Sequence, residues 1–358
     1  MRIAVDLVHV TGHRGGTETY VREVLPHLAA HGAELVGLLN RELAADPPAW
    51  LPDRTVALPV SGANRVAWAA AENALVPAAA RRVGADVLWC PANFGPVLSP
   101  VPVVLTVHDL LPLRHPELVA GGAWAVQLLV RTAVRGARHV LADSRATAAD
   151  LTELLGVPAD RVTVVPLAGP PPVPAPPAPP AGAPFLLSTG NRLPHKNYEV
   201  LLRALALLPP AQRPLLVVPG SDGPDSLRPL VDELGLTADV ELRGWVDAAE
   251  LDALYRGATA YVAPTRFEGF GLPVLEAMAR GCPVVCSDLP VLREVGGDAA
   301  VYVDTTRPEP LAAALRTVLA DAPGRARRVE AGLAQAGRFG WDRTAAATVA
   351  VLARVGGR

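Results

Sequence analysis

The sequence predicts an α/β protein built from two doubly wound domains of parallel strands. Short runs rich in valine and leucine alternate with helical patterns in both halves of the chain. These runs are almost continuously apolar, which is typical of parallel strands buried on both faces. A proline-rich segment divides the chain near its middle, and a length of 358 residues fits two domains better than one.

The first half alternates strand and helix from its first residues. Helical patterns cover residues 18–31, 65–83, 124–139 and 147–155. The predicted strands of this half are RIAVDL, ELVGLL, TVALPV, DVLWC, VPVVLTVHD, HVLADS and VTVVPLA. Helical crossovers between successive strands predict a parallel sheet.

The second half repeats this alternation. Its predicted strands are FLLSTG, LLVVPG, VELRGW, AYVAP, PVVCSD and AVYVD. Its predicted helices cover residues 198–208, 226–234, 248–256, 273–280, 310–319 and, at the end of the chain, 341–355. In such folds a ligand binds beyond the carboxyl ends of the strands, where the loops begin. With two domains, the expected site is the cleft between them.

Residues 166–184 contain ten prolines in nineteen positions. Proline lacks the amide N–H and favours the polyproline II conformation, so we expect a semi-rigid linker. A proline-rich binding motif is the alternative. The predicted organisation is therefore a first domain over 1–165, this linker, a second domain over 185–340, and a C-terminal helix over 341–358 that returns to the first domain.

Composition excludes several classes of function. The chain has 33 basic and 35 acidic residues, so no basic excess is available to bind the phosphates of DNA or RNA. Three sparse cysteines favour reduced core thiols in the cytoplasm over a disulfide framework. The N-terminus resembles a first strand more than a signal peptide.

The apolar runs are too short to span a membrane. The helix predicted over 124–139 is amphipathic and carries Arg131, Arg135 and Arg138. This pattern is compatible with peripheral contact between the helix and an anionic membrane surface. The alternative is an ordinary solvent-exposed helix.

The most informative segment is PTRFEGFGLPVLEAMARG, residues 264–281. A strand ends there, a glycine-rich turn follows, and a helix begins near Pro273. The free N–H groups and positive dipole end of such a helix suit a phosphate. Glu268 precedes the turn, and Glu276 is expected in the first helical turn, where it also complements the dipole. Two acids around a phosphate-type turn suit a nucleotide sugar.

A second loop, FLLSTGNRLPHKN, opens the second domain and brings together Arg192, His195 and Lys196. Lys196 is the single lysine of the chain, against thirty-two arginines. Codon bias explains the arginines, whereas a compact ammonium acts as a point charge where a guanidinium would not fit. Three cations at one site would stabilise the charge of a leaving diphosphate.

The first domain offers two weaker candidates. His108 follows a buried strand. Its ring either hydrogen-bonds a sugar hydroxyl or phosphate of the substrate, or is hydrogen-bonded within the protein and has a structural role. Gly15 and Gly16 precede a helix for which Thr17 is the expected N-cap. This pair is not the GxGxxG fingerprint, and neither half has that motif, which argues against a nicotinamide oxidoreductase.

The segment from Thr265 to Gly281 resembles the Glu-x7-Glu signature of family 4 retaining glycosyltransferases with the GT-B fold. The resemblance implies two Rossmann-like domains facing a central cleft. It implies that Glu268 faces the donor sugar hydroxyls and Glu276 holds the ribose. It also implies that the sugar or diphosphate meets the amides of Phe270, Gly271 and Leu272.

Other segments extend the resemblance over most of the chain. The loop with Gly190, Pro194, Lys196 and Asn197 is similar to the diphosphate loop of the family. His195 stands where the family has arginine, so either Arg192 or His195 assists Lys196. Four further segments match. TVHDL with His108 is similar to the mannosyltransferase-like branch. The others are the first-domain glycine loop with Gly15 and Gly16, the base-reading loop with Trp245 and Val246, and ADSRATAADL at residues 142–151.

The predicted reaction is transfer of a sugar from a nucleotide diphosphate sugar to a hydroxyl or amine acceptor, with retention of configuration. His108, Lys196 and Glu268 are the predicted catalytic residues. The branch favours GDP-mannose and leaves UDP- and TDP-sugars open. No cofactor or metal is expected, since no Asp-x-Asp motif ends a strand. The alternatives are a catalytically inactive nucleotide-sugar-binding protein and a phosphorylase whose pyridoxal phosphate would need Lys196.

Overall fold

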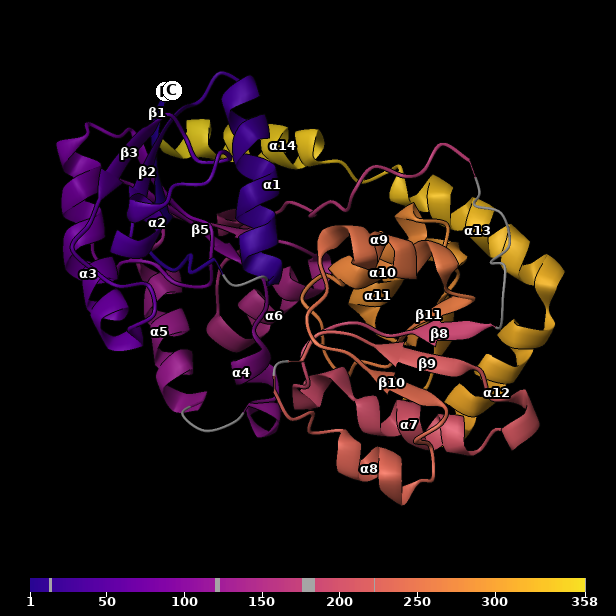
Figure 1. Cartoon of the computed structure of the whole chain (residues 1–358). Coiled ribbons are helices and arrows are strands. Elements are labelled where there is room, and N and C mark those ends of the chain that lie inside the picture. Colours follow the sequence, from indigo (N-terminus) through magenta and orange to yellow (C-terminus); the bar gives the residue numbers. More distant parts are fainter. Residues whose placement is uncertain (13–14, 120–122, 176–183, 222, 358) are drawn as a thin grey trace. The chain divides into compact units, whose positions relative to one another are not determined.

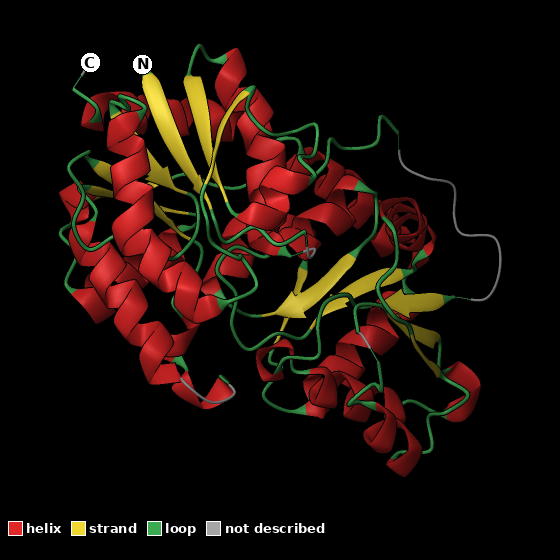
Figure 2. Cartoon of the chain, turned by 60° about the vertical axis from the view of Figure 1, so that its left-hand side comes forward, coloured by secondary structure: helices red, strands yellow, loops and turns green. Residues whose placement is uncertain are grey.

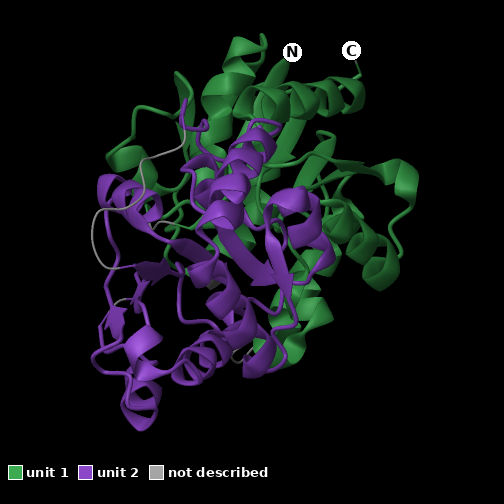
Figure 3. Ribbon diagram, turned by 90° about the vertical axis from the view of Figure 1, so that its right-hand side faces the viewer, with its two compact units in different colours: residues 1–167, 340–358 green, residues 168–339 purple. Residues whose placement is uncertain are grey.

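The computed structural model describes residues 1–12, 15–119, 123–175, 184–221 and 223–357, which form two compact units (Figures 1 and 3). Unit 1 comprises Met1–Leu167 and Gly340–Arg358, and unit 2 comprises Ala168–Phe339. Each unit is a parallel sheet with helices packed around it (Figure 2). The prediction of two doubly wound α/β domains is therefore confirmed. The cleft expected between them stays a prediction.

The sheet of unit 1 has the order β3-β2-β1-β4-β5-β6-β7, and all its neighbours are parallel. β1 is the third strand in this order and pairs with β2 on one side and with the middle strand β4 on the other. Strands β1 to β3 follow one another towards one edge of the sheet, and β4 to β7 follow one another towards the other edge. The topological switch point therefore lies between β1 and β4. The strands are β1 (Arg2–Leu7), β2 (Glu34–Leu39), β3 (Arg54–Ala57), β4 (Val87–Cys90), β5 (Val103–Val107), β6 (His139–Ala142) and β7 (Val162–Val164).

The helices of unit 1 match the predicted ones to within a few residues. Two short helices that the apolar pattern did not reveal, α2 and α4, follow β2 and β5. The helices are α1 (Gly16–Ala30), α2 (Arg41–Ala45), α3 (Arg65–Arg82), α4 (Leu111–Arg114), α5 (Ala123–Gly136), α6 (Arg145–Leu155) and α14 (Trp341–Val355).

The C-terminal helix α14 returns to unit 1, as predicted, and packs against α1 (Figures 1 and 3). The rings of Tyr20 and Trp341 lie 6.1 Å apart between centroids. Thr344 donates to the carbonyl of Pro166 over 2.8 Å. Helix α14 thus buries its apolar face on a domain that begins more than three hundred residues earlier in the chain.

Unit 2 repeats the parallel arrangement with the order β10-β9-β8-β11-β12-β13. Its central strand β8 pairs with β9 and β11, so the switch point lies between β8 and β11. The strands are β8 (Phe185–Leu187), β9 (Leu215–Val218), β10 (Val240–Leu242), β11 (Ala260–Ala263), β12 (Val284–Ser287) and β13 (Val301–Val303).

Two helices of unit 2 were not found in the sequence, α11 and α13. Helix α13 is rich in arginine and poor in large apolar residues, and it packs on α10 where Gly332 meets the side chain of Met278. The helices are α7 (Tyr198–Ala206), α8 (Arg228–Glu233), α9 (Ala248–Gly257), α10 (Leu272–Ala279), α11 (Pro290–Gly296), α12 (Pro308–Ala320) and α13 (Ala322–Ala336).

The predicted linker over 166–184 is partly integrated into unit 2. The boundary between the units falls after Leu167, and residues 168–175 belong to unit 2. There the amide of Val173 donates to the carbonyl of Ala279 over 2.9 Å, and the backbone at Gly169 packs on Leu275. This part of the segment is anchored by packing and does not act as a spacer. The remainder, 176–183, lies outside the described residues.

The three cysteines are buried free thiols, and burial raises the pKa of Cys286 to about 12. Such thiols are packing residues and poor nucleophiles. Over the described ranges, no helix is both long and apolar enough to cross a membrane.

Candidate active site

Two loops of unit 2 begin at the switch point of its sheet. One follows β8 and contains residues 188–197, and the other follows β11 and leads into α10. Because β8 and β11 are parallel neighbours, both loops leave the same edge of the sheet, where α/β proteins bind ligands. A pocket opens between them. Its polar lining residues are Ser188, Thr189, Lys196, Tyr198, Tyr261, Thr265 and Glu268.

Lys196 and Glu268 form the charged centre of this pocket. The Nζ atom of Lys196 donates to Oε1 of Glu268 over 2.7 Å, and the two side chains are 18% and 17% exposed. The loops after β8 and β11 are thereby joined by an ion pair that solvent still reaches. A bound anion at this point would compete with the Glu268 carboxylate for the ammonium group.

Asn197 fixes the position of Lys196. It adopts a left-handed conformation with φ of 57°, and its side-chain amide donates to the carbonyls of Pro264 and Thr305 over 3.0 Å each. Asparagine tolerates this conformation better than most residues. Asn197 therefore joins the loop after β8 to the ends of β11 and β13, and its role in the motif is to hold the loop.

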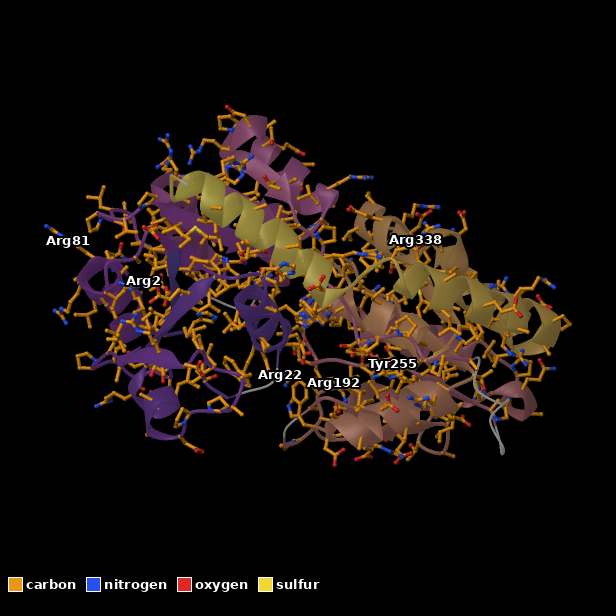
Figure 4. The ribbon with its side chains drawn as sticks, turned by 90° about the horizontal axis from the view of Figure 1, so that it is seen from above. Arg2, Arg22, Arg81, Arg192, Tyr255 and Arg338 are labelled. Atoms are coloured by element: carbon orange, nitrogen blue, oxygen red, sulfur yellow. The ribbon has the colours of Figure 1, made fainter. Side chains whose placement is uncertain are left out.

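The guanidinium of Arg192, which is labelled in Figure 4, is bonded to groups of the protein itself. Its guanidinium pairs with Asp225 and donates to the carbonyls of Gly190, Val218 and Pro219. Although burial acts in the opposite direction, the bonds from Arg192 hold the pKa of Asp225 below its usual range. All N–H groups of the guanidinium are used on the protein. In this arrangement Arg192 orders the loops after β8 and β9. Its assistance to Lys196 at a donor diphosphate stays a prediction.

His195 is also not the expected cation. Burial and the neighbouring ammonium of Lys196 lower its pKa to about 4, so the imidazole is neutral near pH 7. Its backbone carbonyl accepts from the amide of Arg266 over 2.7 Å and from the hydroxyl of Thr265 over 2.9 Å. Of the three predicted cations, Lys196 is thus the one whose positive charge faces the pocket.

The turn before α10 requires a glycine. Gly271 has φ of 97°, and a Cβ atom there would lie 2.7 Å from Cδ2 of Leu292. The preceding Phe270 is buried and packs edge-on against Phe339 at 5.8 Å. The turn therefore delivers the chain into α10, where Pro273 has no amide N–H and the amide of Val274 donates to the carbonyl of Gly271 over 3.0 Å. Whether the amides of Phe270, Gly271 and Leu272 meet a donor stays a prediction.

Glu276 lies in the second turn of α10, which corrects the expectation that it complements the helix dipole. Its carboxylate accepts from the hydroxyl of Tyr255 over 3.0 Å. Burial and the Glu276 charge raise the pKa of Tyr255 well above its usual value, so the phenol keeps its proton. The hydroxyl of Tyr255, a residue labelled in Figure 4, also lies 3.3 Å from Oγ1 of Thr189. That Oγ1 atom is in turn 3.2 Å from the hydroxyl of Tyr261.

This network was missed in the sequence. Tyr255 and Tyr261 lie in apolar stretches and gave no polar signal. Their hydroxyls meet Thr189 only because β8, β11 and α9 are brought together in the fold. The network connects the carboxylate of Glu276 to the loop after β8, so that both predicted acids are tied to the loop that carries Lys196.

The predicted base-reading residues lie further along the same edge. Trp245 and Val246 are in the loop between β10 and α9, and about half of the Trp245 side chain is exposed. The amide of Gly220 donates to the carbonyl of Gly244 over 3.1 Å, which joins this loop to the one after β9. Contact with a base stays a prediction.

In unit 1, His108 lies at the end of β5 and has acceptors on both ring nitrogens. Nδ1 is 2.6 Å from Oδ2 of Asp143, and Nε2 is 2.9 Å from the carbonyl of Pro91. Because a carbonyl only accepts, Nε2 carries a proton. Burial lowers the pKa of His108, but the Asp143 carboxylate outweighs this and leaves the pKa above its usual value.

This geometry fits the structural alternative for His108. Contact between its ring and a donor sugar, as predicted, requires exchange of one of these two bonds. Asp143 was not singled out in the sequence, although it directly follows the strand β6, as His108 follows β5. Because β5 and β6 are parallel neighbours, residues that directly follow them lie close together, and this position could have indicated the pairing of His108 with Asp143.

The glycine pair of unit 1 starts α1. Gly15 is the N-cap, with an extended backbone, and the helix begins at Gly16, so Thr17 is inside the first turn and is not the cap. A Cβ atom at either glycine would meet nothing within 4 Å. The described packing therefore does not require glycine here. Its role as a donor contact stays a prediction.

No group of three or more His, Cys, Asp and Glu side chains is placed to hold a metal ion within the described parts of the chain. The expectation of a metal-independent reaction stays a prediction.

Two family models match the chain. The model for "Glycosyltransferase Family 4" matches residues 14–168, and the model for "Glycosyl transferases group 1" matches residues 174–335. An O-antigen chain mannosyltransferase B from Escherichia coli is 32% identical over 264 residues, which cover 69% of this chain and 68% of that protein. A D-inositol 3-phosphate glycosyltransferase from Thermobispora bispora is 31% identical, with coverages of 96% and 92%.

Solved structures share the fold. Sucrose-phosphate synthase from Thermosynechococcus elongatus superposes with a TM-score of 0.79 at 21% identity, covering 99% of this chain and 98% of the other. The Alr3699/HepE protein from Anabaena, solved in complex with UDP, has a TM-score of 0.73 at 18% identity, with coverages of 99% in both chains.

Two parallel α/β units, a lysine and two glutamates around a helix-initiating turn, and these matches define a glycosyltransferase of the GT-B fold. The chain belongs to glycosyltransferase family 4, whose second domain is the group 1 domain.

Proposed function

We propose that this protein transfers a glycosyl group from a nucleotide diphosphate sugar to a hydroxyl or amine acceptor, with retention of configuration. The observation that carries the proposal is the placement of Lys196 and Glu268 in one pocket of unit 2. The carboxylate of Glu276 is connected to this pocket through the hydroxyl of Tyr255, which lies 3.3 Å from the lining residue Thr189. The relatives add support, since one is named a mannosyltransferase and another a D-inositol 3-phosphate glycosyltransferase. The Anabaena protein was solved with UDP and with UDP-glucose.

We assign each charged group a task. The diphosphate displaces Glu268 from the ammonium of Lys196, which then stabilises the leaving charge. The freed Glu268 carboxylate accepts hydrogen bonds from donor sugar hydroxyls. The carboxylate of Glu276, oriented by Tyr255, accepts from the ribose hydroxyls. The amides of Phe270, Gly271 and Leu272 face the phosphate or sugar oxygens.

In the proposed chemical step, the C–O bond to the diphosphate breaks and a C–O or C–N bond to the acceptor forms on the same face of the sugar. The bond from the anomeric carbon to the diphosphate oxygen breaks with its electron pair going to the diphosphate. The bond to the acceptor oxygen or nitrogen forms from the same side. The acceptor proton moves to the departing diphosphate oxygen. No cofactor, metal or protein nucleophile takes part in this scheme.

The donor is the first quantity to measure. Thermal-shift titration with GDP-mannose and with UDP-, TDP- and ADP-sugars identifies the nucleotide, because a ligand that binds the native state raises Tm by mass action. We expect GDP-mannose to give the largest shift. A larger shift with UDP- or TDP-sugars would replace it as donor, and no shift with any of them would contradict the proposal.

Turnover separates an enzyme from an inactive binding protein. We expect slow hydrolysis of the donor by the wild type, and loss of that hydrolysis in Lys196→Ala. Binding without hydrolysis or transfer to any acceptor would favour the inactive nucleotide-sugar-binding alternative. The anomeric proton coupling of the first-formed product tests retention, and an inverted product would overturn the same-face step.

A further inference from the structure

Helix α5 of unit 1 carries an exposed face whose purpose the transfer reaction does not explain. Trp124 is 73% and Leu128 54% exposed, and both arginines that follow at helical spacing are exposed. The spacing of i, i+4, i+7 and i+11 places the four on one side of the helix. The α5 face consists of Trp124, Leu128, Arg131 and Arg135.

The α5 face cannot turn inward, because the opposite side of the helix is already buried. Val130, Ala133 and Val134 pack into the core of unit 1. The side chain of Gln127 also donates to the carbonyl of Pro112 over 2.7 Å, which ties α5 to α4. Trp124 and Leu128 are therefore held in solvent, where large apolar side chains lose the favourable free energy of burial.

The charge on this surface has one sign. Helix α5 contains no acidic residue, and Arg138 follows it closely. Among the ion pairs of the described residues, none engages Arg131, Arg135 or Arg138. The surface thus offers positive charge without an acidic partner in the described chain, although the whole chain has a net charge of −2.

A second exposed apolar group lies at the arginine end of the helix. Leu98 is 82% exposed, and it follows a backbone segment packed against the end of α5. A Cβ atom at Gly136 would lie 2.6 Å from the carbonyl oxygen of Val97. Apolar side chains therefore lie near both ends of the helix, with the arginines between them along the α5 face.

We propose that the α5 face docks unit 1 on an anionic lipid bilayer. Trp124 and Leu128 enter the interfacial region, which suits the amphipathic indole ring. Arg131 and Arg135 bind headgroup phosphates, and each basic residue near an anionic surface contributes about 1 kcal/mol. Three arginines beside exposed apolar groups fit a bilayer better than a nucleic acid, which would not use Leu128. This inference is independent of the proposed transfer reaction.

The test is co-sedimentation of the full chain with vesicles of phosphatidylcholine alone or mixed with phosphatidylglycerol. We expect binding to the anionic vesicles only, weakened by salt as surface charge is screened. Arg131→Gln and Arg135→Gln should each weaken binding about fivefold. The double variant Trp124→Ser/Leu128→Ser should abolish it.

Matched controls are Leu207→Ser, an exposed leucine of unit 2, and Arg327→Gln, an exposed arginine of α13. Both should bind as the wild type does. Equal binding to neutral vesicles, unchanged binding by the double variant, or no binding at all would overturn the proposal. A concentration-dependent dimer in sedimentation velocity, lost in Trp124→Ser and unaffected by vesicles, would overturn it in favour of a second copy of the chain.

Discussion

The two units each place a charged pair at the carboxyl edge of a parallel sheet, and the pairs differ in access. In unit 2, Lys196 and Glu268 are 2.7 Å apart and 18% and 17% exposed. In unit 1, His108 and Asp143 are 2.6 Å apart and 13% and 2% exposed, and the second nitrogen of His108 is bound to a carbonyl. The first pair can exchange a partner for a ligand, whereas the second is fixed in the core.

This difference teaches that a charged residue after a strand is not by itself a ligand group. Arg192 makes the same point within unit 2, since it lies four residues from Lys196 and is committed to Asp225. Whether a charged side chain stabilises the fold or can bind a substrate depends on which hydrogen-bond acceptors the rest of the unit supplies. The following predictions test it, starting with the largest effect.

Replacing Lys196 should break the reaction and leave the fold intact. We expect Lys196→Ala to lower the transfer rate about 10²–10³-fold, as is typical when one group that stabilises developing charge is lost. The free energy of unfolding should fall by about 1 kcal/mol, because one hydrogen-bonded ion pair is lost and the carboxylate of Glu268 stays in contact with solvent. Activity assays and urea unfolding measure the two quantities. Arg203→Ala, which removes an exposed ion pair of α7, is the control, and similar rates in both variants would contradict the assignment.

Replacing Asp143 should mainly lower the stability of the fold, in contrast to the replacement of Lys196. Asp143→Asn removes a charge-assisted hydrogen bond from a buried side chain, and we expect a loss of about 1.5–3 kcal/mol in the free energy of unfolding. Urea unfolding of the two variants, Asp143→Asn and Lys196→Ala, gives a direct contrast. If Lys196→Ala were the more destabilised protein, the proposed difference between the structural pair His108–Asp143 and the substrate-binding pair Lys196–Glu268 would be contradicted.

The glycines of the two units offer a second contrast. Gly271→Ala forces a side chain into a positive φ and against Leu292, so we expect a loss of about 1–3 kcal/mol in unfolding free energy. Gly15→Ala has an extended backbone and open space, so its stability should stay within about 0.5 kcal/mol of the wild type. Thermal and urea unfolding measure both. Equal losses would mean that the described packing does not explain either glycine.

The last contrast concerns a buried acid of unit 1, whose effect on stability depends on pH. Burial raises the pKa of Asp6 from 3.8 to about 6, although the amide of Val8 and the Glu72 side chain oppose the shift. The folded state thus favours the protonated acid, so this group costs stability progressively as pH rises from about 4 to 6 and by a constant amount above. Asp6→Asn should remove that slope, which amounts to about 3 kcal/mol for a shift from 3.8 to about 6. An unchanged pH dependence of unfolding would refute this role for Asp6.

Much of the fold could be predicted because its signals are local. Continuous valine and leucine runs specified buried parallel strands, and α14 was found with its bounds because its apolar face repeats at helical spacing. Helix α13 was missed because small residues and arginines supply little such periodicity, and its place is set by close packing of Gly332 on α10. Residues 168–175 were taken for linker because packing on α10 leaves no mark in a proline-rich sequence.

By itself, the sequence determined the two parallel α/β units and the glycine turn into α10, and it predicted Lys196 and the two glutamates as site residues. Only the tertiary structure decided which charges are available. Arg192 is occupied by Asp225, which lies thirty-three residues away, and His195 is neutral because burial excludes its charged form. Glu276 is oriented by Tyr255 from another helix. Element formation follows local periodicity, whereas protonation and free hydrogen-bonding capacity depend on desolvation and on partners distant in the chain.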